Sequence, residues 1–84
     1  MMVTIKDSYK VAIETKYIGP SNIKGSRVKA TAQTDNQITL TWDDSLNSAQ
    51  NHARAAAALC EKMDWNGHLV GGGTKTGEVF VFVD

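Results

Sequence analysis

Residues 43–67, DDSLNSAQNHARAAAALCEKMDWNG, decide the fold because they are the one stretch whose pattern predicts a helix. Asp43, Asp44 and Ser45 are candidate N-caps, and Asn66-Gly67 is a candidate stop, since glycine adopts the left-handed conformation that ends many helices. Apolar residues recur at the three- and four-residue spacing of one helix face: Leu46, Ala49, Ala53, Ala56, Cys60 and Met63, with Leu59 beside them.

The residues before this helix predict a three-stranded antiparallel meander. Apolar and polar residues alternate in 9–18 (YKVAIETKYI), 26–33 (SRVKATAQ) and 37–42 (QITLTW), which is the period of half-buried strands. The glycines and proline of 19–25 (GPSNIKG) indicate a loop, and 34–36 (TDN) suits a tight turn. One face of the meander is apolar and is expected to receive the helix.

The chain continues with 69–83, LVGGGTKTGEVFVFV, whose glycines raise the question of a phosphate-binding loop. Such a loop needs a lysine directly after its last glycine and a helix after that, whereas Lys75 lies between threonines and a strand follows. Ser21-Asn22-Ile23-Lys24 and Lys75-Thr76-Gly77 match two signatures of serine β-lactamases, but the third is absent and the chain is too short. The stretch therefore predicts a hairpin with Lys75 at its tip.

Both faces of the last predicted strand are apolar, with Val79, Val81 and Val83 on one side and Phe80 and Phe82 on the other. A single helix covers one face of a sheet. Either the second face is shielded by neighbouring side chains, or it meets a partner. We predict self-association through Phe80 and Phe82.

The length and composition of the chain predict a single small domain over residues 1–84. Nine basic and nine acidic residues give zero formal charge, which is unlike a strongly basic nucleic-acid binder. One cysteine excludes an internal disulfide and is typical of a reducing compartment. We expect no signal peptide and no membrane span, and thus a cytoplasmic protein.

The inventory of reactive residues argues against catalysis, a bound metal or a cofactor. His52, Cys60 and His68 lack the paired spacing of zinc ligands. We expect His52 on the surface and Cys60 in the core, where it is no nucleophile. Asp43 and Asp44 are explained by capping. We therefore predict a protein that is not an enzyme.

A basic segment is the remaining candidate site. Four cations lie between residues 16 and 29, and no acid falls between Thr15 and Gln33. Such a surface suits a phosphate backbone or an acidic protein surface, or is simply a solvated strand face. A tyrosine among the cations offers stacking or an interface contact. The predicted partner-binding residues are Lys16, Tyr17, Asn22, Lys24, Arg27 and Lys29, with Lys75 as an addition.

Residues 14–30 (ETKYIGPSNIKGSRVKA), 55–65 (AAAALCEKMDW) and 71–83 (GGGTKTGEVFVFV) resemble small uncharacterised proteins of phages and prophages. The resemblance spans most of the chain, and its core is T-K-Y-x-G-P-x-N-x-x-G-S-R. It implies a context and no residue roles: such accessory proteins often bind host proteins or nucleoprotein complexes, including as anti-CRISPR inhibitors.

The sequence thus predicts an α+β domain, ββ(β)αβ(β), with one helix on an antiparallel sheet of four to five strands. The first functional hypothesis is a non-enzymatic phage protein that binds and inhibits a host defence protein or nucleoprotein complex. The alternatives are a small nucleic-acid binder that uses the same basic residues, and a homodimeric structural module.

Overall fold

The computed structural model describes residues 2–4, 11–33 and 36–83, and it shows the predicted α+β fold. The strands are β1 (Ala12–Ile18), β2 (Arg27–Ala32), β3 (Asn36–Thr41), β4 (His68–Gly73) and β5 (Glu78–Val83), and the helix is α1 (Ser48–Met63). All neighbouring strands pair antiparallel in one five-stranded sheet of order β3-β2-β1-β5-β4. The first three strands form the predicted meander, and β5 returns to pair with β1.

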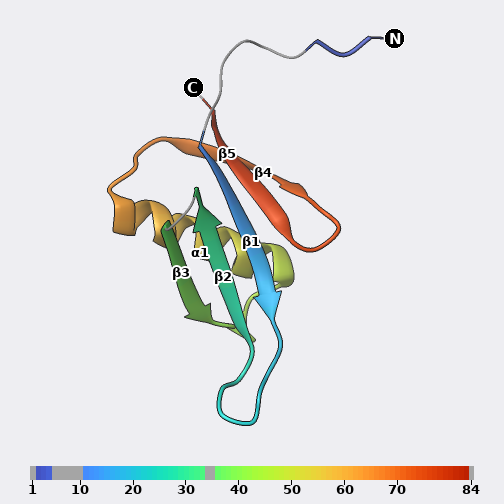
Figure 1. The fold of residues 1–84 in the computed structure, drawn as a ribbon, viewed down its shortest axis with the longest axis vertical. Coiled ribbons are helices and arrows are strands. Elements are labelled where there is room, and N and C mark those ends of the chain that lie inside the picture. The colour runs from blue at the N-terminus through green and yellow to red at the C-terminus, as the bar shows by residue number, and fades with distance from the viewer. Residues whose placement is uncertain (1, 5–10, 34–35, 84) are drawn as a thin grey trace.

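The helix lies across one face of β1, β2 and β3, and the β4–β5 hairpin extends to the side of it (Figure 1). Strand alternation sends Ile13, Val28 and Ala30 toward the helix, and each is fully buried. Leu59 reaches down from α1 to meet them and is likewise fully buried. The opposite face of the sheet has no second layer among the described residues.

The helix begins later than the sequence pattern predicted. Its N-cap is Asn47, whose side chain accepts from the backbone N–H of Gln50 at 2.8 Å while the Gln50 side chain accepts from the backbone N–H of Asn47 at 2.9 Å. This reciprocal capping box satisfies two N–H groups that the first turn leaves free. Asp43 and Ser45 form a turn before the helix instead, with the Asp43 carboxylate accepting from the Ser45 hydroxyl at 2.6 Å. The Ser45 backbone N–H donates to the same carboxylate at 3.0 Å. Both hydrogen bonds favour the ionised carboxylate and lower the pKa of Asp43.

The helix also ends differently, and the face that it turns to the sheet is the predicted one only in part. Asp64, with φ of 57°, is the left-handed C-cap in place of the predicted Asn66-Gly67. Ala56, Leu59 and Cys60 of the predicted stripe are buried, whereas Ala49 and Ala53 are exposed. The residues that α1 buries are Asn51, His52, Ala55, Ala56, Leu59 and Cys60.

The hairpin predicted for residues 69–83 is present, with a shorter turn than expected. Gly71 to Gly73 belong to β4, and the turn closes through a hydrogen bond from the Thr74 N–H to the Gly77 carbonyl at 2.8 Å. Lys75 is at the tip. The turn predicted at 34–36 falls partly on residues 34 and 35, which lie outside the described part of the chain.

Candidate partner-binding surface

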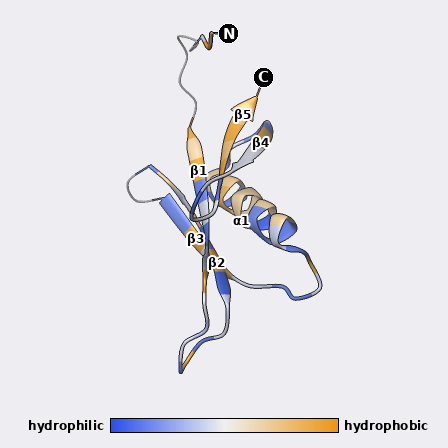
Figure 2. Ribbon diagram, turned by 90° about the vertical axis from the view of Figure 1, so that its right-hand side faces the viewer, coloured by the Kyte–Doolittle hydropathy of each residue, from blue (hydrophilic) through white to orange (hydrophobic). Residues whose placement is uncertain are grey.

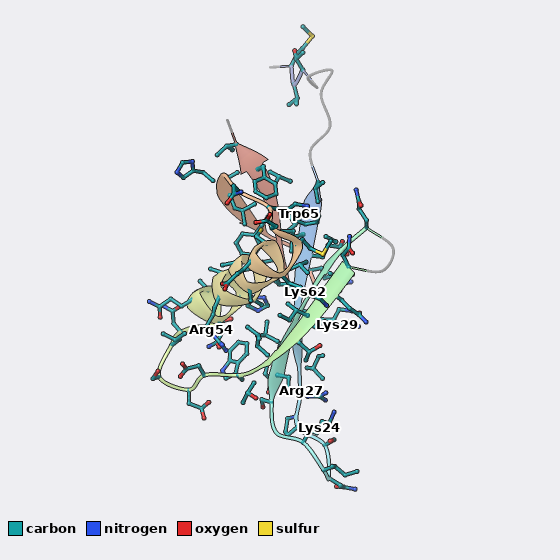
Figure 3. All side chains as sticks on the ribbon, turned by 90° about the vertical axis from the view of Figure 1, so that its left-hand side faces the viewer. Lys24, Arg27, Lys29, Arg54, Lys62 and Trp65 are labelled. Carbon is teal, nitrogen blue, oxygen red and sulfur yellow. The ribbon has the colours of Figure 1, made fainter. Side chains whose placement is uncertain are left out.

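The face of the sheet opposite the helix carries three of the predicted cations. Strand alternation places Lys16 of β1 and Lys29 of β2 there, and the register makes them direct cross-strand partners. Arg27 lies on the same face two residues from Lys29, opposite Thr41 of β3. In Figure 3, Lys29 and the helix lie on opposite sides of the sheet. We call Lys16, Arg27 and Lys29 the basic face.

The electrostatics of the basic face favour an anionic partner. Like charges directly opposite one another on neighbouring strands destabilise a sheet, and an anion between Lys16 and Lys29 relieves that repulsion. Glu14 of β1 also lies on this face, two residues from Lys16 and opposite Thr31, so one carboxylate stands beside the three cations. The remaining polar side chains of the face are Thr31, Gln37, Thr39 and Thr41.

The β1–β2 loop extends this surface beyond the sheet, as Figure 1 shows. A turn orders its tip: the Ser21 N–H donates to the Lys24 carbonyl at 2.7 Å, and the Lys24 N–H donates to the Ser21 hydroxyl at 3.1 Å. Asn22 and Lys24 are exposed there, as expected for contact residues. Ile23 between them is 91% exposed, which gives the projecting tip an apolar side chain that the sequence reading did not select.

Tyr17 does not share the basic face, which corrects its predicted grouping with the cations. It follows Lys16 in β1 and therefore points to the helix side of the sheet, where its ring meets Trp42 edge-to-face at a centroid distance of 5.0 Å. Its hydroxyl is hydrogen-bonded to the Ser26 hydroxyl at 2.9 Å. Lys75 is separate as well, because it lies in the β4–β5 turn and not on the meander.

In β5 the phenylalanines face the core and the valines face outward, which is the reverse of the predicted interface. Phe80 is buried at 8% exposure and belongs to the core, and Phe82 packs against that core with its ring edge-to-face with Trp65. The placement of a self-association surface on Phe80 is therefore wrong. The apolar strip left open is made of valines on the other face, and Figure 2 shows the strongly hydrophobic β5 beside the paler β4. We call these residues the valine strip: Val70, Val79, Val81 and Val83.

His52 was expected on the surface and is instead 4% exposed beneath the sheet. Its Nδ1 and the Thr15 hydroxyl are hydrogen-bonded at 2.7 Å, and its ring meets Trp42 edge-to-face. Asn51 beside it is fully buried and exchanges hydrogen bonds with the backbone of Asp43, both at 2.9 Å. These polar groups satisfy one another within the fold. Their spacing from Ala55 and Leu59 was the signal that they face inward.

A pocket of about 480 Å³ lies where the C-terminal half of α1 meets the start of β4. Cys60, Trp65 and Leu69 give it apolar walls, and Glu61 and Asp64 give it an acidic side. Burial raises the pKa of the Cys60 thiol, so the thiol is protonated at neutral pH and is a poor nucleophile. Within residues 2–4, 11–33 and 36–83, no group of three or more His, Cys, Asp and Glu residues is placed to hold a metal ion.

The burial of Cys60 predicts slow chemical labelling. We expect Ellman's reagent to react with native protein at least about tenfold more slowly than with protein unfolded in urea, because both exposure and thiolate are lacking. The absorbance of the released thiolate measures both rates on one sample. Equal rates in the two states would show that the thiol is open to solvent through the pocket.

In the described part of the chain, no helix has the length and apolar character needed to cross a membrane. Comparison of the chain with family models, with curated proteins and with solved structures finds no match. The fold and its surfaces are therefore the basis for assigning a function.

Proposed function

We propose that the protein is a non-enzymatic interaction module whose basic face binds an acidic surface on a macromolecular partner. The observation that carries this proposal is the direct pairing of Lys16 with Lys29 on a sheet face that no described element covers. Two ammonium groups held side by side repel each other in the free protein. Glu14 is one carboxylate against the three cations of this face, so the face keeps a positive excess that an acidic partner surface would balance.

A protein surface fits this face better than single-stranded nucleic acid does. Proteins that bind single strands stack bases on exposed aromatic rings. Here Tyr17 and Trp42 contact each other on the helix side, so the basic face offers cations and threonines without a ring. The zero formal charge of the chain also gives little long-range attraction to a polyanion. The projecting β1–β2 loop, with exposed Ile23 beside Lys24, adds the mixed apolar and charged contact typical of protein interfaces.

Duplex nucleic acid is the second candidate, favoured by the threonines of the basic face. Thr31, Thr39 and Thr41 lie on the same face as the cations, and hydroxyl groups beside lysine and arginine are common phosphate ligands. This candidate predicts binding that weakens steeply with salt, because each neutralised phosphate releases counterions.

The biological context of the proposal comes from the resemblance to small phage proteins. In that context, the partner is a host defence protein or nucleoprotein complex, and the protein inhibits it by occupying a surface that the complex needs.

The test pairs two variants with the same change in net charge. K16A/K29A removes two positive charges from the basic face, and A49E/A53E adds two negative charges at exposed positions of α1. Tagged wild-type protein and both variants are used to capture partners from bacterial lysate, with and without nuclease. We expect a nuclease-resistant partner that K16A/K29A binds at least about tenfold more weakly, whereas A49E/A53E retains it.

Fluorescence anisotropy with a labelled DNA duplex and an RNA duplex separates the two candidates. Binding that disappears with nuclease in the lysate, and that falls steeply with salt on the purified duplexes, would favour nucleic acid. Equal capture by wild type and K16A/K29A, with no duplex binding, would rule out the basic face as the site.

A further inference from the structure

The two edges of the sheet differ, and the difference begins with β3. The Trp42 N–H donates to the Ser26 carbonyl, so the alternation of an antiparallel ladder turns the backbone groups of Gln37, Thr39 and Thr41 outward. Lys62 donates to the Gln37 carbonyl at 2.9 Å, and Arg54 donates to the Thr41 carbonyl at 2.5 Å. Both cations come from α1 (Figure 3). The helix thus protects this edge from pairing with another strand.

The β4 edge has no comparable cover within the described residues. The hydrogen bond from Thr74 to Gly77 sets the alternation there, and it turns the N–H and C=O groups of Leu69, Gly71 and Gly73 outward. No described side chain bonds to them. An open row of backbone donors and acceptors is a template for another strand.

Of the three glycines in β4, Gly72 and Gly73 are not required by any contact within one chain. Gly71, by contrast, has to be a glycine, because a Cβ there would lie 2.6 Å from the ring of Phe80. A Cβ on Gly72 or Gly73 would meet nothing within 4 Å, and neither has a positive φ. Glycine weakens the interior of a strand, and it often indicates a place where another backbone approaches closely.

We propose that the outer edge of β4 pairs with β4 of a second copy of this chain, antiparallel about a two-fold axis at Gly71. That register sets Gly71 opposite Gly71 and Leu69 opposite Gly73, so each outward N–H meets an outward C=O. It also sets Val70 opposite Gly72 on the face of the valine strip. Large side chains therefore lie beside glycines on both faces of the new pair, and the valine strips of the two copies become continuous.

Charge complementarity at the ends of the pair favours a second copy as the occupant. In this register, Lys75 of the partner subunit is level with Gly67, at the rim of the pocket that Glu61 and Asp64 line. The C-terminal end of α1, which carries partial negative charge, is at the same place. The symmetry repeats the contact, so each tip lysine meets the acidic pocket of the other chain.

Proline substitution tests the pairing because it removes one outward N–H. Gly73→Pro removes an N–H that the β4–β5 ladder does not use, and Thr39→Pro is the matched change on the β3 edge. Sedimentation velocity over a range of concentrations measures association. We expect the wild type and Thr39→Pro to form dimers with similar dissociation constants, and Gly73→Pro to raise the constant at least about tenfold.

A second pair of variants tests the same pairing without proline, in case either proline variant does not fold. Val70→Lys places a charge on the half-exposed valine beside the edge, and Lys75→Glu reverses the tip charge. Each is expected to weaken the dimer at least about threefold, with the Lys75→Glu effect fading as salt is added. A wild type that stays monomeric at high micromolar concentration would overturn the proposal. Dimers that none of the β4 variants weakens would also overturn it, and so would capture by the β4 edge of a different protein in place of the second copy.

Discussion

Gly77→Ala is expected to destabilise the protein severely, although it adds one methyl group. A Cβ built on Gly77 would lie 2.0 Å from the carbonyl oxygen of Thr15 and 3.1 Å from its carbonyl carbon. Both are backbone atoms of β1, so no side-chain rotation relieves the overlap. The start of β5 would have to move away from β1, where Glu78 pairs with Thr15. We expect a loss of about 3 kcal/mol or more from a total stability of roughly 4–13 kcal/mol for a chain of this length.

Urea denaturation followed by circular dichroism measures this loss, with Gly25→Ala as the control. A Cβ on Gly25 would meet nothing within 4 Å, and its φ is not positive. Its substitution should therefore change the free energy of unfolding by less than about 0.5 kcal/mol, or raise it slightly by restricting the unfolded chain. Similar urea midpoints for the two variants would contradict the close contact between β5 and β1.

The requirement at Gly77 illustrates what the sequence could and could not predict. A glycine in a hairpin indicates a turn, but the contact that forbids a side chain involves Thr15, more than sixty positions earlier. Alternation predicted the three strands of the meander and their faces, because each strand has one polar and one apolar side. It could not choose a buried face for β5, where both sides are apolar, and so Phe80 was placed on the wrong surface.

The helix errors have a similar cause. Several residues before α1 are good caps, and the choice among them depends on the reciprocal bonds of Asn47 and Gln50. The alanine-rich centre of α1 has apolar residues on more than one side, so polar Asn51 and His52 could occupy the buried face without interrupting an obvious stripe. For the candidate site, alternation predicted the shared face of Lys16, Arg27 and Lys29, while the exposed Ile23 depends on a loop geometry that no periodic pattern encodes.

The proposed dimer and the basic face are compatible in one assembly. A two-fold axis perpendicular to the sheet at Gly71 keeps the open faces of both copies on one side. The valine strips then lie at the centre, and the cations of each copy lie outward of them on the same side. An acidic partner with two equivalent sites would bind such a dimer more tightly than either copy alone, through effective concentration.

His52→Ala is expected to cause the second large loss, about 3 kcal/mol, because it removes packing and a hydrogen bond from the core together. The His52 ring lies edge-to-face with Trp42 at a centroid distance of 5.9 Å, and deleting it leaves a cavity under β1. Thr15 is 2% exposed, and its hydroxyl loses the hydrogen bond of 2.7 Å to His52 Nδ1. What remains for Thr15 is a longer hydrogen bond to the Glu78 carbonyl at 3.4 Å.

A double-mutant cycle separates the hydrogen bond from the packing. Thr15→Val keeps the side-chain shape and leaves His52 Nδ1 unsatisfied, at an expected cost of about 1–3 kcal/mol. Because both single variants break the same bond, the double variant should be less damaged than the sum of the two by at least about 0.5 kcal/mol. Thr39→Val is the matched control, since its hydroxyl is exposed on the open face, and it should change stability little. Additive losses in the cycle would mean that the Thr15–His52 hydrogen bond contributes nothing, and that packing against Trp42 alone explains why a histidine is buried at this position.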